Sequence, residues 1–129
     1  MSAALLWPAA ALAAGSETLR VVLRNDGAQA LRCVMIKAHF MSETLDAIAA
    51  GDALNLVLQR DPADGALFVL ADDGRRQMIE NILCGADDDW SETRGELPLL
   101  PLRTASAARI ELSCVVEGRL LCAVMEPDD

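Results

Sequence analysis

The last apolar segment of the chain constrains the fold most. Apolar side chains occupy alternate positions from Ile110 to Val116 and from Leu120 to Val124, with Gly118 between the two runs. This period of two is typical of β-strands that bury one face. A hairpin centred on Gly118 projects both apolar sets to the same side, whereas a register shifted by one residue exposes one of them. We therefore predict a hairpin in which Cys114 lies directly opposite Cys122.

Short strands separated by turn sequences are also predicted along the rest of the chain. Their hydrophobic patterns cover residues 18–24, 30–41, 53–60, 66–71 and 77–84. The pattern of residues 77–84 also fits one face of a helix. Turn residues at Asn25–Ala28 and Asp61–Gly65 favour chain reversals, and we expect the first of these turns to close a hairpin. The two prolines of residues 97–102 place that segment at a sheet edge, because proline cannot donate to a central ladder.

These patterns predict an all-β chain with one domain. The chain has 129 residues and no internal repeat, which fits a single core that we place at residues 17–129. The expected fold is a small antiparallel β-sandwich, immunoglobulin-like, with about seven strands. Its core must be aliphatic, since the chain contains two Trp, two Phe and no Tyr.

Residues 1–16 form an apolar leader or tail that resembles an export signal. An apolar run from Ala3 to Ala14 ends in small residues before a polar stretch, and no Lys or Arg precedes it. Twelve helical residues span about 18 Å, which is too short for a hydrocarbon core of about 30 Å, so we expect no transmembrane span. The alternative is a tail that packs on the domain or on a partner. We expect a periplasmic or secreted protein.

The cysteines are consistent with this compartment. They are even in number, none belongs to a Cys-x-x-Cys pair, and they lie at Cys33, Cys84, Cys114 and Cys122. Zinc-ribbon and thioredoxin-like spacings are therefore absent. An exported chain would form two disulfides, whereas a cytosolic chain would keep four buried thiols. Because Cys114 faces Cys122, we predict that Cys33 pairs with Cys84.

Charge and motif content exclude several functions. A net charge of -9 argues against nucleic acid as a partner, since binding to its phosphates depends on Lys and Arg. The sequence has one histidine, His39, and lacks the nucleophile elbow, phosphate loop, dinucleotide fingerprint and His-Glu-x-x-His motif. A Ser or Cys nucleophile would depend on His39, which lies within a predicted central strand. We interpret His39 as structural and expect no enzyme activity and no cofactor.

A copper site is the alternative interpretation of the same strand. Four residues with odd numbers would share one strand face, and these are Cys33, Met35, His39 and Met41. Thiol, thioether and imidazole groups are soft ligands that suit Cu(I). His39 and Met41 resemble a fragment of the His-x-Met copper motif of periplasmic copper chaperones with a cupredoxin-like fold. This resemblance covers three residues and implies a copper(I) carrier, while the other interpretation is that both methionines fill gaps in the core.

Acidic residues concentrate in turns and in one long loop. The clusters at Asp61–Asp64 and Asp72–Asp73 match no twelve-residue calcium loop, and we interpret them as solvated turns. The segment from Gly85 to Pro101 is longer than a simple turn, and long loops in compact domains are usually functional or disordered. It surrounds Trp90 with four carboxylates, those of Asp87, Asp88, Asp89 and Glu92. We predict a protein-contact surface anchored by Trp90, the alternative being that Trp90 plugs the core.

The sequence thus favours an exported, disulfide-stabilised binding or accessory subunit without catalytic activity. Its expected partner is another protein, for example a subunit of a larger exported or membrane-associated complex. The alternative function is that of a periplasmic copper(I)-binding carrier.

Overall fold

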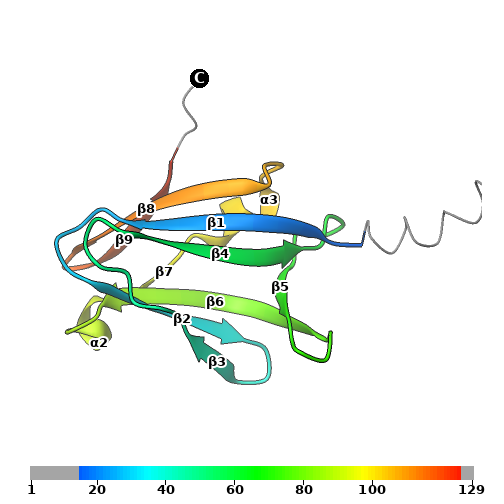
Figure 1. Cartoon of the computed structure of the whole chain (residues 1–129), viewed down its shortest axis with the longest axis horizontal. Helices are drawn as coiled ribbons and strands as arrows, with labels where there is room; N and C mark the ends of the chain where they lie inside the picture. Colours follow the sequence, from blue (N-terminus) through cyan, green and yellow to red (C-terminus); the bar gives the residue numbers. More distant parts are fainter. Residues whose placement is uncertain (1–14, 126–129) are drawn as a thin grey trace, which may run out of the picture.

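The structure is a computed structural model that describes residues 15–125 (Figure 1). All but the last two residues of the predicted leader lie outside the described residues. Within residues 15–125 strands predominate, so the expected all-β class is confirmed. No helix in this range is both long enough and apolar enough to cross a membrane.

Residues 15–125 form nine strands and two short helices. The strands are β1 (Glu17–Asn25), β2 (Leu31–Lys37), β3 (Met41–Thr44), β4 (Ala53–Arg60), β5 (Leu67–Leu70), β6 (Arg76–Ala86), β7 (Gly95–Glu96), β8 (Arg109–Glu117) and β9 (Arg119–Val124). The helices are α2 (Trp90–Thr93) and α3 (Leu99–Thr104). Residues 77–84 lie within β6, so the strand prediction is right for the segment that also fitted a helix.

The strands belong to one mixed sheet. Its order among the described residues is β3-β2-β6-β5-β4-β1-β8-β9, and β7 pairs with β6 outside this order. Neighbouring strands are antiparallel except for β1 and β8, which are parallel. The expectation of about seven antiparallel strands is therefore wrong in number and in pairing. The additional strands are β3, which forms because the chain reverses after β2, and the two-residue β7.

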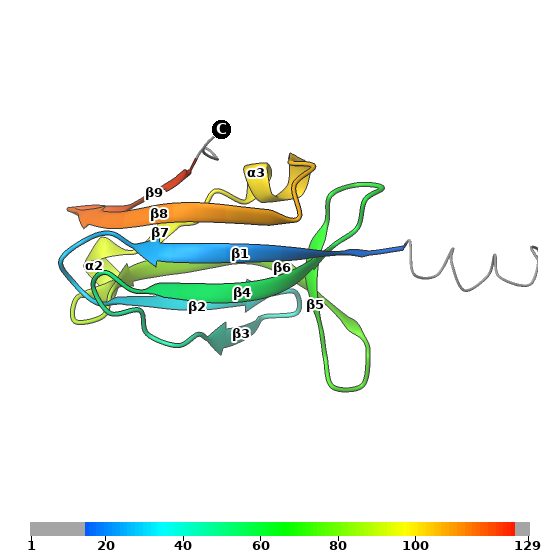
Figure 2. The ribbon, with the colours of Figure 1, turned by 45° about the horizontal axis from the view of Figure 1, so that its top comes forward.

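The sheet folds back on itself around an aliphatic core. Strand β5 crosses one end of the molecule between β4 and β6, so that β2 and β6 lie across the core from β1, β4 and β8 (Figures 1 and 2). The inward side chains alternate along the strands as predicted, with Leu19, Val21 and Leu23 of β1 all buried. They belong to the same apolar cluster as Leu112 of β8 and Ile82 of β6. Removal of this apolar surface from water is the main force that stabilises the arrangement.

Two disulfides link neighbouring strands. Cys33 of β2 is bonded to Cys84 of β6, and Cys114 of β8 is bonded to Cys122 of β9, with each pair directly opposed in register. Both bridges have the predicted pairing, and the β8–β9 hairpin turns at Gly118 as predicted. Because neither bridge crosses the core, residues 15–125 lack the inter-sheet disulfide of antibody domains. The immunoglobulin-like type is not confirmed.

The first predicted hairpin does not form. Strand β1 pairs with β4 and β8, whereas β2 pairs with β3 and β6, so residues 26–30 connect two separate parts of the sheet. Asn25 is buried there and uses its side chain to hold the connection. Its Nδ2 donates to the carbonyl oxygens of Gln29 and Ile48 at 2.8 and 2.9 Å, and its Oδ1 accepts from the N–H of Gly27 at 3.1 Å. The turn residues thus support a crossing between layers.

Residues 97–102 contribute to a helix, and the prediction of an edge segment is wrong. Helix α3 begins at Leu99, after Pro98, and Pro101 is its third residue. The first N–H groups of a helix have no intrahelical acceptor, so a proline in the first turn breaks no backbone hydrogen bond. Proline at these positions is therefore as compatible with a helix start as with a sheet edge. Leu102 is buried and packs into the core.

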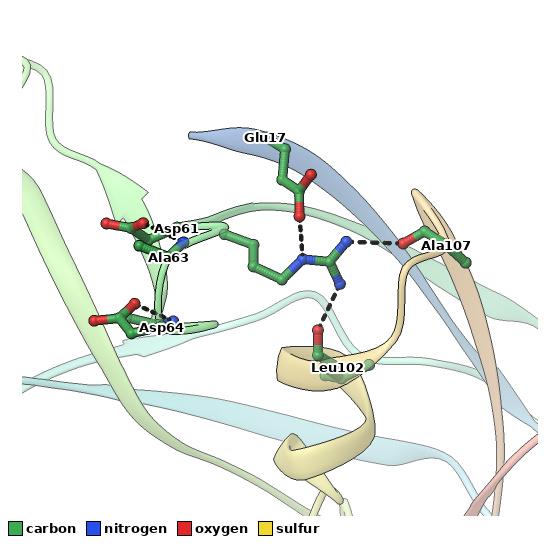
Figure 3. Close-up of polar contacts among 8 residues, drawn as sticks. Glu17, Asp61, Ala63, Asp64, Leu102 and Ala107 are labelled. Carbon is green, nitrogen blue, oxygen red and sulfur yellow. Dashed lines mark hydrogen bonds and ion pairs between the residues drawn. The ribbon is translucent and has the colours of Figure 1, made fainter. Parts of the chain in front are cut away.

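A buried arginine holds the segment that follows α3. Arg60 is 2% exposed at the end of β4. Its Nε donates to Glu17 Oε1 at 2.7 Å, and its two terminal nitrogens donate to the carbonyl oxygens of Leu102 and Ala107 at 2.8 and 3.0 Å (Figure 3). A buried charge is tolerated when it is paired and hydrogen-bonded. Arg60 therefore joins β1, α3 and the segment that leads into β8.

Candidate functional site

A short helix orders the predicted contact loop. Residues 87–89 follow β6 and lead into α2, whose last residue, Thr93, binds back to the sheet. The Oγ1 of Thr93 accepts from the N–H of Ala86 at 2.8 Å and donates to the carbonyl oxygen of Asp89 at 2.7 Å. Gly85 permits this close packing, because a Cβ at that position would lie 3.0 Å from the backbone of Arg94. The loop is thus held against β6.

Four carboxylates are exposed on this ordered segment. We call them the α2 acidic surface, and they belong to Asp87, Asp88, Asp89 and Glu92. The exposure of all four agrees with the prediction for the loop. Because their backbone is held by Thr93, a partner would meet charges that are already in position.

Trp90 lies at the border of this surface and is half-buried. Its indole Nε1 donates to the carbonyl oxygen of Arg32 at 3.0 Å. The guanidinium groups of Arg32 and Arg94 lie 5.3 and 5.4 Å from the ring centroid, which are cation–π distances. Trp90 is thus positioned against β2 with part of its surface accessible.

Arg32 also approaches the α2 acidic surface. Its Nε lies 3.6 Å from Asp87 Oδ1, which is an ion-pair distance and too long for a hydrogen bond. Within residues 15–125 this nitrogen is buried without a hydrogen-bond acceptor. Two arginines therefore offset part of the negative charge beside Trp90. Among residues 15–125, no Lys or Arg forms an ion pair with Asp88, Asp89 or Glu92 of the α2 acidic surface.

The predicted copper-binding face does not form. Strand β2 ends at Lys37, and the chain reverses into β3, which pairs with β2. Cys33 is in a disulfide and Met35 is buried, whereas His39 and Met41 lie beyond the strand end and are exposed. Within the described range 15–125, no three His, Cys, Asp or Glu side chains group together as a metal site requires. The geometry on which the copper interpretation depends is therefore missing.

The strand predicted over residues 30–41 is confirmed for Leu31–Lys37 and is wrong beyond Lys37, where the chain reverses. His39 and Phe40 adopt φ angles of 66° and 62°, in the left-handed region that rarely accommodates residues other than glycine. The sequence there contains none of the residues that usually signal a turn. His39 is accordingly an exposed turn residue, and its interpretation as a structural residue of a central strand is wrong.

Carboxylates of the two turn clusters bond to their own backbone. The Oδ1 atoms of Asp61 and Asp64 accept from the N–H groups of Ala63 and Ala66 at 2.9 Å (Figure 3). Asp73 accepts in the same way from the N–H of Arg75 at 3.0 Å. These are the local hydrogen bonds that make aspartate a preferred turn residue. They agree with the interpretation of these clusters as solvated turns.

A groove between the β2–β3 hairpin and β4 was not foreseen from the sequence. It encloses about 530 Å³, and its lining includes Met35, Glu43, residues 55–58 of β4 and residues 69–72 at the end of β5. Lys37, which is 7% exposed, lies in its wall and donates to Glu43 Oε1 and Gln77 Oε1 at 3.0 Å. We call this feature the β3–β4 groove. The β3–β4 groove exists because of the way the strands pair, and local sequence patterns do not predict strand pairing.

The chain shows a distant structural likeness to a solved protein. No protein-family model matches the chain, and no curated protein matches it. A structure described as "NMR structure of the protein from Eubacterium rectale" is similar over 87% of this chain and 92% of its own length, with 8% sequence identity and a TM-score of 0.48. At this identity and TM-score the likeness carries no information on function.

Proposed function

We propose that this protein is an exported, non-catalytic binding or accessory subunit that acts through contacts with another protein. The observation that carries the proposal is the α2 acidic surface, with four exposed carboxylates on a segment that Thr93 holds against β6. Clustered charge of one sign attracts a partner of opposite charge and accelerates association. A surface that is already ordered also loses less conformational entropy on binding.

The disulfides support an oxidising compartment for this function. All four cysteines are bonded, and such bridges form and persist in the periplasm or outside the cell. They also restrict the unfolded chain, which favours the folded state of a small aliphatic domain. This supports the periplasmic or secreted location that we propose.

The placement of the reactive groups supports binding over catalysis. His39 is exposed in the turn between β2 and β3, and the cysteines are unavailable as nucleophiles because they are in disulfides. A general base must lie within hydrogen-bond reach of the group that it deprotonates. Within residues 15–125, the single histidine makes no side-chain hydrogen bond to a candidate nucleophile or carboxylate.

The test is to neutralise the α2 acidic surface without changing side-chain size. Asp88→Asn, Asp89→Asn and Glu92→Gln are combined, and the full chain is cross-linked in an extract of exported proteins at low and at physiological salt. We expect a basic partner that the unmodified protein captures best at low salt and that the triple variant captures at least about tenfold less well.

The matched control combines Asp46→Asn, Asp52→Asn and Glu80→Gln, which neutralise three exposed carboxylates elsewhere on the chain. The net charge is then the same as in the first variant. Capture of the same partner to the same extent by both variants would show that the α2 acidic surface does not bind it.

A further inference from the structure

Strand β4 has one paired edge and one open edge. It pairs with β1 along its whole length, from Ala53 to Arg60. On the other side, β5 pairs only with Gln59 and Arg60. Over residues 53–58, no strand within residues 15–125 pairs with this second edge. An open edge presents unpaired N–H and C=O groups, which can template the addition of another strand.

The register identifies the backbone groups that face the open side. The N–H of Asn25 donates to the carbonyl oxygen of Asp52 at 2.8 Å, which continues the β1–β4 register by one residue. Hydrogen-bond direction alternates along an antiparallel strand. The N–H and C=O groups of Asn55 and Val57 therefore point away from β1. Gln59, the next residue in this series, pairs with Phe68 of β5, as the alternation requires.

The open edge borders the β3–β4 groove and carries exposed apolar side chains. Val57 and Leu70 line the groove and are 54% and 56% exposed. Met35, Leu56 and Leu58 also line it and are buried. An added strand would pair with the backbone of β4 and remove Val57 and Leu70 from water, and both effects favour binding.

The size and charge of the groove select its occupant. A volume of about 530 Å³ lies in the range of sites that enclose a small ligand or a short chain segment. Among the charged side chains that line it, Lys37 is paired with Glu43, which leaves Asp72 exposed at the rim. The chain as a whole carries a charge of -9. An extended segment with apolar and basic residues in alternation fits a groove of this volume and complements its negative charge. Successive side chains of a strand point to opposite faces, so the apolar and the basic side chains of such a segment lie on different sides.

We propose that the open edge of β4 accepts such a segment of a partner protein as an added β-strand. The backbone of the segment pairs with Asn55 and Val57, its apolar side chains contact Val57 and Leu70, and its basic side chains lie near Asp72. The β3–β4 groove is a different surface from the α2 acidic surface, and the inference stands whether or not the latter binds a partner.

Amide hydrogen exchange of the full oxidised chain, followed by NMR, tests the proposal. The probe is a nine-residue synthetic peptide in which lysine and valine alternate, and the control peptide has glutamate in place of lysine. We expect the amides of Asn55 and Val57 to exchange rapidly in the free protein and at least about tenfold more slowly with the lysine peptide. The amides of Leu54 and Leu56, which face β1, should not change. The glutamate peptide should bind at least about tenfold more weakly.

A proline substitution on the open edge tests the backbone contact directly. Val57→Pro removes the N–H that faces the groove and leaves the hydrogen bonds to β1 in place, whereas Val57→Thr retains that N–H. We expect the proline variant to bind the lysine peptide at least about tenfold more weakly than the threonine variant, at an unchanged melting temperature. If Val57→Pro does not fold, Asn55→Pro serves in its place, because Asn55 faces the same side.

Four outcomes would overturn the proposal. The first is protection of the Asn55 and Val57 amides already in the free protein, which would mean that the edge is not open. The second is peptide-induced protection at other strands instead. The third is equal binding of the proline and threonine variants, and the fourth is equal binding of the lysine and glutamate peptides.

Discussion

The β2–β3 and β8–β9 hairpins reverse the chain by different means. Gly118 turns the β8–β9 hairpin with a φ of 78°, whereas His39 and Phe40 turn the β2–β3 hairpin with φ of 66° and 62°. Glycine adopts this region at no steric cost, while a residue with a Cβ loses about 1 kcal/mol or more. The β8–β9 hairpin also contains its own disulfide, whereas the disulfide of β2 leads to β6.

The β8–β9 hairpin is determined by its own residues, whereas the β2–β3 hairpin is determined by its surroundings. In β8–β9 the turn residue, the apolar alternation and the cross-link all lie within residues 109–124. The β2–β3 turn is strained, and contacts outside it hold it closed. These include the hydrogen bonds from Lys37 to Glu43 and Gln77, and the pairing of β2 with β6. Three experiments on stability test whether the two hairpins differ in this way.

The largest effect is expected from the two disulfides. Their sequence separations are 51 residues for Cys33–Cys84 and 8 residues for Cys114–Cys122. A longer loop restricts the unfolded chain more, so replacing the first pair by alanine should lower the free energy of unfolding by about 4 kcal/mol and replacing the second by about 2.5 kcal/mol. Urea denaturation of the two double variants measures both values. An equal or larger loss of stability for the Cys114–Cys122 pair would contradict the view that the β2–β3 hairpin depends on contacts outside it and the β8–β9 hairpin on its own residues.

An intermediate effect is expected at Lys37. Lys37→Met retains much of the buried aliphatic stem but removes the ammonium group that bonds to Glu43 and Gln77. We expect a loss of about 1 to 2 kcal/mol in the free energy of unfolding, because hydrogen bonds to charged groups are stronger than neutral ones. The amides of β3 that pair with β2 should also exchange faster. A variant as stable as the unmodified protein would show that these contacts do not hold the β2–β3 hairpin closed.

The smallest effects are expected at the turn residues, and they should have opposite signs. Gly118→Ala introduces a Cβ at positive φ and should cost about 1 kcal/mol. Phe40→Gly relieves the same conformation, and Phe40 is 104% exposed, so few contacts are lost. We expect a gain of about 0.5 kcal/mol after the greater unfolded-state entropy of glycine is included. Thermal unfolding of both variants provides the check, and destabilisation by Phe40→Gly would contradict a strained turn.

The same contrast shows which parts of the fold could be predicted from the sequence. The β8–β9 hairpin, its facing cysteines and strands β4, β5 and β6 follow from local alternation and turn residues. The turn at His39 and Phe40 could not be foreseen, because tertiary contacts stabilise a conformation that the local residues disfavour. The parallel pairing of β1 with β8 joins distant segments, and alternation alone does not specify a partner strand.

The candidate site likewise has features that could be predicted from the sequence and features that could not. Exposure of the four carboxylates near Trp90 follows from their polarity and their position in a loop. The arrangement of Trp90 does not follow, because its hydrogen-bond acceptor, the carbonyl oxygen of Arg32, lies 58 residues earlier in the chain. The open edge of β4 could not be predicted from the sequence either, because it results from the short pairing of β4 with β5.

The parallel pair of β1 and β8 bears on when the chain can fold. Residues Arg20–Asn25 lie beside residues Arg109–Cys114, so β1 acquires one of its two neighbours from the last third of the sequence. A polypeptide made from its N-terminus therefore cannot complete the pairing of β1 until residues 109–114 have emerged. Completion of the native sheet is consequently a late event of biosynthesis. A chain made only as far as α3 leaves one edge of β1 without its native neighbour.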